Sequence, residues 1–228
     1  MNKKIKDFIN KYGALIDNDN WAELYKIAEK DLDSWTGFLT DALHGADIYP
    51  LEELDYVPEA FAFGSITPKF DIPEGIKTIS ADAFGDCTAI EITLPQSLEI
   101  IDTEAFASCH GLTTITIPNK VDTIGSGAFD GCKKLTSVNI PSKLKVIESA
   151  TFNLCSALTN VDTYSADRLE RIEDRAFQGC ANLDELYIPP SVTYIANKAI
   201  PYHTVILCKE NSYAHEYAIA KDRSYKLV

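Results

Sequence analysis

Cysteine is the residue type whose spacing first suggests chemistry in this sequence. Five of the six cysteines recur at steps of 22, 23, 23 and 25 residues; they are Cys87, Cys109, Cys132, Cys155 and Cys180. Zinc sites use pairs at CxxC-like spacing, and no such pair is present. Even spacing instead predicts one core position per repeat, where a free cysteine packs as a small apolar residue.

We also predict that these thiols stay free. Cysteines stacked on neighbouring coils would have Cα atoms about 5 Å apart, which is within disulfide range, but their Cβ vectors would run parallel. Cys208 lies outside the series.

No other pattern indicates catalysis or a bound cofactor. The four histidines (His44, His110, His203 and His215) are scattered and none has HExxH spacing. The sequence has no GxGxxG, phosphate-binding glycine loop or EF-hand loop. We therefore predict no catalytic, cofactor-binding or metal-binding residues and a protein that is not an enzyme. The alternative is an enzyme subunit with its site in the N-terminal helices, at Asp17, Asp19, Glu23, Asp33 and His44.

The elements that must carry the cysteines are short repeats. Ala-Phe or Thr-Phe pairs precede each cysteine by three residues, at Phe84, Phe106, Phe129, Phe152 and Phe177. Ile-Pro or Leu-Pro pairs keep the same interval, at 72–73, 94–95, 117–118, 140–141 and 188–189. A repeat this short cannot bury its own apolar face, so neighbouring coils must cover it.

One strand per repeat is expected. Residues 112–117 alternate, with Ile115 and Ile117 predicted to point inward and Thr114 and Thr116 outward. The following proline ends the pairing because it has no N–H to donate. Gly, Ser and Asp around the Ala-Phe pair predict a tight turn on the opposite face.

The repeat pattern resembles the BspA-type leucine-rich repeats of bacterial proteins. The resemblance implies a right-handed leucine-rich-repeat solenoid with a parallel β-sheet on one face and a C-terminal capping helix. Together with an N-terminal α-helical cap, predicted from the helical period of the first residues, this gives an α+β fold. Three repeats depart from the pattern. The first lacks one residue between Cys87 and Leu94, the fifth has Tyr164-Ser165 in place of Ile-Pro with two added residues, and the sixth has Ala199-Ile200 in place of Ala-Phe.

Four segments are predicted. Residues 1–49, with a helical period, form an N-terminal cap; a separate small binding module is the alternative. Residues 50–71 form a degenerate first repeat, residues 72–207 form the repeats of 22–25 residues, and residues 208–228 form a capping helix and tail. The terminal sequence around Tyr213 and Tyr217 is similar to the helix that closes BspA-type arrays.

The net charge of −13 restricts the classes of partner that the chain is expected to bind. Repulsion from phosphates argues against nucleic acid and against an anionic membrane surface, which leaves a protein or peptide, with a basic one favoured. The sequence specifies no oligomeric state. It shows no signal peptide and no apolar stretch of membrane-spanning length, so we expect a cytoplasmic protein, with a cell-surface or secreted protein as the alternative.

The outward strand positions are the predicted binding face, because solenoids offer an extended sheet surface to partners. They are Glu91, Thr93, Thr114, Thr116, Ser137, Asn139, Asn160, Asp162, Glu185 and Tyr187. We predict a non-catalytic protein–protein interaction scaffold, with a BspA-type surface adhesin as the alternative. The competing interpretation is that the threonines are there only as good strand formers.

Overall fold

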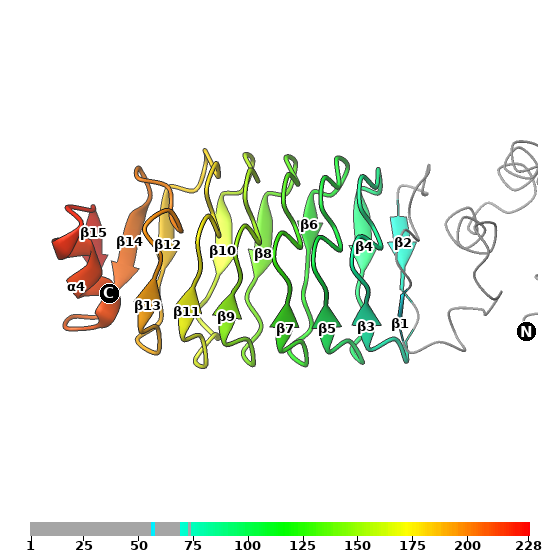
Figure 1. The fold of residues 1–228 in the computed structure, drawn as a ribbon, viewed down its shortest axis with the longest axis horizontal. Coiled ribbons are helices and arrows are strands. Elements are labelled where there is room, and N and C mark those ends of the chain that lie inside the picture. Colours follow the sequence, from blue (N-terminus) through cyan, green and yellow to red (C-terminus); the bar gives the residue numbers. More distant parts are fainter. Residues whose placement is uncertain (1–55, 58–68, 73) are drawn as a thin grey trace, which may run out of the picture.

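The computed structural model describes residues 56–57, 69–72 and 74–228. In it the chain winds as stacked coils along one long axis (Figure 1). The predicted N-terminal helices, and most of the predicted degenerate repeat, lie outside the described residues. Their assignment stays a prediction.

One side of the solenoid, called the front face here, carries the strands that the alternating pattern predicts. Five of them form a parallel sheet: β2 (Lys69–Asp71), β4 (Glu91–Thr93), β6 (Thr114–Ile115), β8 (Ser137–Asn139) and β10 (Asn160–Asp162). Their register is regular, so that Val138 pairs with Val161 in the next coil and both are buried. The front sheet is interrupted after β10, where the fifth repeat carries its added residues.

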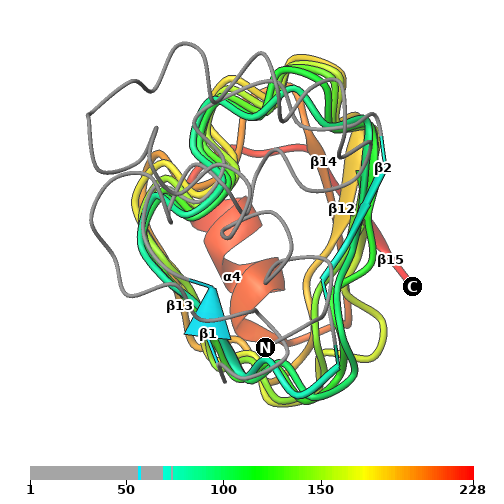
Figure 2. The same ribbon diagram turned by 90° about the vertical axis from the view of Figure 1, so that its right-hand side faces the viewer.

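The opposite side, called the back face, carries a second set of parallel strands. These are β1 (Tyr56–Val57), β3 (Thr78–Ile79), β5 (Ile100–Ile101) and β7 (Thr123–Ile124), followed by a second sheet of β9 (Val146–Ile147), β11 (Arg171–Ile172) and β13 (Tyr194–Ile195). Figure 2, which looks down the solenoid, shows the two faces on opposite sides. The prediction of a sheet on one face only was wrong. Each back strand has two residues, too few to produce an alternating pattern in the sequence.

Phenylalanine rings form the centre of the core. The rings of Phe84, Phe106, Phe129, Phe152 and Phe177 are fully buried and stack nearly parallel, with centroids 5.1–5.5 Å apart. Each ring therefore covers the one before it, as a ladder of equivalent residues requires. The cysteines lie in the same buried core.

The turns between the two faces use left-handed backbone at two places in most coils. In the fourth coil these are Ala150 (φ 58°) and Leu154 (φ 57°), and in the third coil they are Gly127 (φ 64°) and Gly131 (φ 71°). Glycine adopts this conformation without a steric penalty, whereas alanine and leucine do not. The fourth coil therefore stores strain that the third coil avoids.

The C-terminal end closes as the sequence predicts. Strands β12 (Glu185–Tyr187), β14 (Val205–Cys208) and β15 (Tyr225–Leu227) form a final front sheet. Helix α4 (Tyr213–Ala220) begins at Ser212, whose hydroxyl accepts a hydrogen bond from the His215 N–H. It buries Ala214, Tyr217 and Ala218 and is the one α-helix of the described part of the chain.

Arg223 fixes the tail that follows the helix. Its buried guanidinium donates to the backbone carbonyls of Ile200 and Pro201 and lies 5.4 Å from the ring of Tyr202. Because those carbonyls belong to the last coil, this side chain ties the tail to the end of the solenoid.

A local irregularity marks the first coil. Gly111 lies so close to the preceding coil that a Cβ atom there would be 2.0 Å from the Thr88 carbonyl oxygen and 2.5 Å from that of Ala89. The later coils have Lys134, Ala157 or Asn182 at this position, two residues after the cysteine. The coil that Gly111 approaches is one residue short.

Candidate functional site

The predicted outward positions do form one row on the front face. Glu91, Thr114, Ser137 and Asn160 are register partners in four successive coils. All ten predicted residues are exposed or partly exposed. The row is continuous through β10, and β12 continues it beyond the interruption.

Some of its charges are already paired. The Lys69 ammonium group lies 2.9 Å from the Glu91 carboxylate, which raises the pKa of Lys69. Lys226 pairs with Glu185 at the other end. Both ion pairs are exposed and therefore weak, but each reduces the net negative charge of the row. The row is less acidic than its carboxylates alone suggest.

Asn139 is a structural residue despite its outward position. Its side-chain oxygen accepts from the Ile117 N–H at 2.7 Å, and its side-chain nitrogen donates to the Ile117 carbonyl at 2.8 Å. The amide thus replaces the backbone partner that Ile117, just past the end of β6, would otherwise need. Both hydrogen-bonding groups of Asn139 are therefore used within the fold.

The most distinctive part of the row is the tyrosine junction, defined here as Asp162, Tyr164 and Tyr187. The two tyrosine rings stack at 4.5 Å with an interplanar angle of 7°, and Tyr164 is 64% exposed. The Asp162 carboxylate accepts from the Tyr164 backbone N–H at 3.1 Å. Burial, followed by the proximity of Tyr164 and Asp167, raises the pKa of Tyr187.

The added residues of the fifth repeat explain why this junction exists. The Thr163 hydroxyl donates to the Tyr187 carbonyl at 2.6 Å, across the gap between β10 and β12. This bond holds the two coils together where the regular strand pairing stops. Tyr164 is consequently placed beside Tyr187, on the surface and not in the core.

The back face carries a polar group that the sequence analysis missed. The Arg171 guanidinium lies 4.1 Å from the Tyr194 ring centroid, and its Nε donates to Glu173 at 2.7 Å. The two residues are register partners in β11 and β13. An outward Arg and Tyr one repeat apart could have indicated this pair, had a second strand per repeat been recognised.

The cysteines are packed in the core, where four of their thiols donate hydrogen bonds. All six are free and buried, as predicted for the five of the regular series; no prediction was made for Cys208. The thiols of Cys109, Cys132, Cys155 and Cys180 each donate to the carbonyl oxygen of the phenylalanine in the preceding coil, at 3.0–3.1 Å. Burial raises the pKa of Cys109 and raises that of Cys180 to about 12, whereas hydrogen bonds with Cys109 and Cys155 lower the pKa of Cys132.

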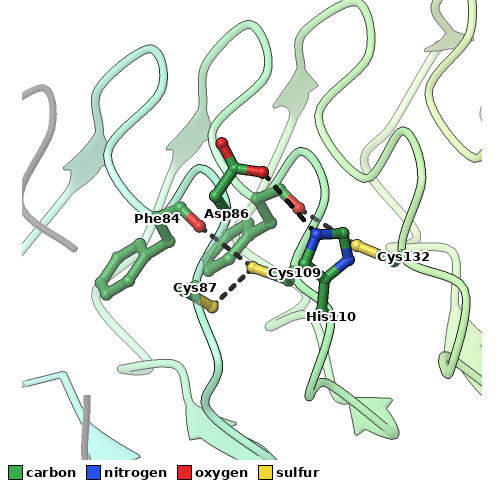
Figure 3. Close-up of polar contacts among 7 residues, drawn as sticks. Phe84, Asp86, Cys87, Cys109, His110 and Cys132 are labelled. Carbon is green, nitrogen blue, oxygen red and sulfur yellow. Dashed lines mark hydrogen bonds and ion pairs between the residues drawn. The ribbon is translucent and has the colours of Figure 1, made fainter. Parts of the chain in front are cut away.

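An imidazole and a carboxylate lie beside two of these cysteines. The His110 Nε2 is 3.8 Å from the Asp86 carboxylate, and both side chains are mostly exposed (Figure 3). The neighbouring Cys109 thiol donates instead to the Phe84 carbonyl. The histidine is thus paired with a carboxylate while the thiol is held by the backbone. Within residues 56–57, 69–72 and 74–228, no group of three or more metal-ligating side chains could hold an ion.

Comparison with known proteins accounts for the repeats. Residues 77–206, more than half of the chain, match the sequence profile of the BspA type leucine rich repeat region in six copies. No curated protein matches the chain. No helix of the described residues has the length and apolar character needed to cross a membrane.

Three solved structures illustrate the likeness. The T. pallidum leucine rich repeat protein TpLRR is 34% identical over 49% of this chain and 51% of its own, with a TM-score of 0.44. A leucine-rich repeat protein from Eubacterium ventriosum is 25% identical over 64% and 45%, with a TM-score of 0.47. The pneumococcal vaccine antigen PcpA is 20% identical over 77% and 39%, with a TM-score of 0.45. The chain spans about half or less of the length of these proteins.

Proposed function

The chain belongs to the BspA-type leucine-rich repeat family, and from that premise we propose that it is a non-catalytic scaffold that binds a partner protein through the tyrosine junction of its front face. Solenoids commonly bind along an extended sheet surface, so the family makes a binding role the reasonable starting point. The observation that carries the proposal is the exposed, stacked pair of Tyr164 and Tyr187 at the interruption of the sheet.

Stacked tyrosines suit a binding site for physical reasons. A tyrosine ring presents a large contact area at a small cost in conformational entropy, and the stack holds Tyr164 in one orientation before a partner arrives. The fold itself does not need this ring on the surface. Because Asp162 pairs with Asn139, Thr163 occupies the place of the buried isoleucine Ile140, and Tyr164 occupies the place of the buried proline Pro141.

The charge around the junction favours a basic partner segment. Asp162 is exposed beside Tyr164, and Asp167 is close enough to raise the pKa of Tyr187. The whole chain has a net charge of −13. A lysine or arginine of the partner can therefore lie over the Tyr164 ring while its charge is near a carboxylate.

A quantitative capture experiment tests this function. The chain is used as bait in extract from its native cells, alongside Tyr164→Ala, Asp162→Lys and the back-face control Tyr194→Ala, each first shown to be folded by circular dichroism. We expect one protein to be retained by the original chain and by the control, and to be at least about tenfold depleted with both front-face variants. Equal retention by Tyr164→Ala, or loss only with Tyr194→Ala, would refute the proposal.

The cell-surface adhesin predicted as the alternative would use the same junction against an extracellular partner. The two settings differ in location alone. Protease treatment of intact cells separates them, since digestion of the chain requires a surface location and protection requires an internal one.

A further inference from the structure

We propose that Cys87 and Cys109 form an oxidation site, in which a peroxide joins the first two regular coils through a disulfide. Their Sγ atoms are in direct contact at 2.6 Å, and both side chains are fully buried (Figure 3). Both thiols are free in the structure. The site is separate from the tyrosine junction and does not depend on the proposed function.

The pair lies at the start of the short first repeat. The chain after Cys87 takes a shorter path to β4 than the equivalent chain takes in later coils. It consequently passes against Gly111, where a Cβ atom would be 2.0 Å from the Thr88 carbonyl oxygen. The same shortened segment begins at Cys87, and the segment that it approaches begins at Cys109.

In the later coils the repeat length is regular, and Cys132, Cys155 and Cys180 donate their thiol hydrogens to phenylalanine carbonyls of the preceding coil. Cys109 makes the same bond to Phe84 and, in addition, contacts the Cys87 sulfur. Because two sulfurs must touch before they can be joined, the 2.6 Å contact favours Cys87 and Cys109. The Cys132 thiol also hydrogen-bonds with those of Cys109 and Cys155, so a bond to Cys132 is the competing outcome.

The chemistry is a two-electron oxidation with hydrogen peroxide as the oxidant. One thiol first reacts with the peroxide, giving a sulfenic acid and one water as the O–O bond breaks. The second thiol then attacks that sulfur, the S–S bond forms, and the sulfenic oxygen leaves as a second water with both remaining protons.

The expected consequence is a stiffer start to the array. The bond closes a loop between residues 22 positions apart and should raise the temperature of thermal unfolding by about 5–10 °C. Because repeats contact only their neighbours, the protection should be concentrated in the first two regular coils.

Peptide mapping of the full chain tests the site directly. No Lys or Arg lies between Lys77 and Lys120, so trypsin releases both cysteines in one peptide, residues 78–120. The folded chain is treated with hydrogen peroxide, unfolded, alkylated with iodoacetamide and digested without reductant. We expect this peptide to take up no alkyl group and to weigh two hydrogens less than the reduced form. After further cleavage at Glu99, between the two cysteines, the two cysteine-containing fragments should stay linked and should separate only when the disulfide is reduced.

Variants and a reductant complete the test. Cys109→Ala should abolish the increase in unfolding temperature, Cys155→Ala should keep it, and dithiothreitol should reverse it. The proposal fails if the 78–120 peptide is alkylated twice after peroxide treatment, or if its cysteines are linked to Cys132 or another cysteine instead. The mapping uses the unmodified chain, so this outcome can be read even if a variant does not fold.

Discussion

Gly111→Ala is the substitution that most directly tests the geometry of the first two coils. The new Cβ atom would be 2.0 Å from the Thr88 carbonyl oxygen and 2.5 Å from that of Ala89, whereas ordinary contact begins at 3.4 Å. Both obstacles are backbone atoms, so no side-chain rotation can relieve the clash. The coils must move apart by roughly an ångström, which strains the bonds between them.

The size of the effect follows from overpacking. Inserting a methyl group into a packed region typically costs 1–3 kcal/mol, and rigid backbone neighbours place this site at about 3 kcal/mol. For a chain of this size, that corresponds to a decrease of about 6–12 °C in unfolding temperature. The loss should be local, because each repeat depends on its neighbours.

Urea unfolding and hydrogen exchange measure the two parts of this prediction. The exchanging amides of interest are those of His110 and Thr113, which donate to the Cys87 and Ile90 carbonyls across the two coils. Lys134→Ala, at the same position one coil later, is the matched control and should change stability by less than about 0.5 kcal/mol. Adding one alanine after Thr88 should lengthen the short coil and reduce the cost of Gly111→Ala to below about 1 kcal/mol. If Gly111→Ala in the original chain lowers the free energy of unfolding by less than about 1 kcal/mol, the close approach does not exist.

Three further predictions concern the turns, the tail and the thiols. Ala150→Gly should stabilise the chain by up to about 1 kcal/mol in urea unfolding, because Ala150 has a φ of 58° that glycine adopts without a penalty, whereas Ala107→Gly should destabilise it. Arg223→Ala should leave the Ile200 carbonyl unsatisfied, cost about 1–3 kcal/mol, and accelerate hydrogen exchange in α4. Burial raises the pKa of Cys180 from 9.0 to about 12, so the unfolded chain loses this proton at a lower pH than the folded chain does. The free energy of unfolding should therefore keep its full value below pH 9 and decrease as the pH rises to 12. The decrease should be shallower in Cys180→Ala.

The repeating part of the fold was predictable because equivalent residues meet. Phe106 stacks on Phe84 and Phe129, and Val138 pairs with Val161, as their common position in the repeat indicates. The back strands were not predictable in the same way. Two residues such as Thr123-Ile124 contain too little sequence for a period to be seen, and their pairing depends on the coils being stacked already.

The positions of the candidate site's residues were predictable from the sequence. Whether their polar groups are free to bind a partner was not. Register placed Asn139 and Asp162 correctly in the outward row. Repeat register gives the side of the sheet on which a residue lies, and it does not show which hydrogen-bonding groups are already used. Asn139 has both of its groups bonded to Ile117, and the Glu185 carboxylate pairs with Lys226, from a tail far away in the sequence.

Unequal coil lengths are the source of both sites proposed for this chain. When two coils have the same length, each residue lies on its equivalent, and the contacts repeat without variation, as in the phenylalanine stack. A length difference brings together atoms that are not equivalent. One missing residue puts Thr88 against Gly111 next to the Cys87–Cys109 contact, and two added residues put Tyr164 on the surface beside Tyr187. Correcting either length should therefore remove the local chemistry while leaving the solenoid intact.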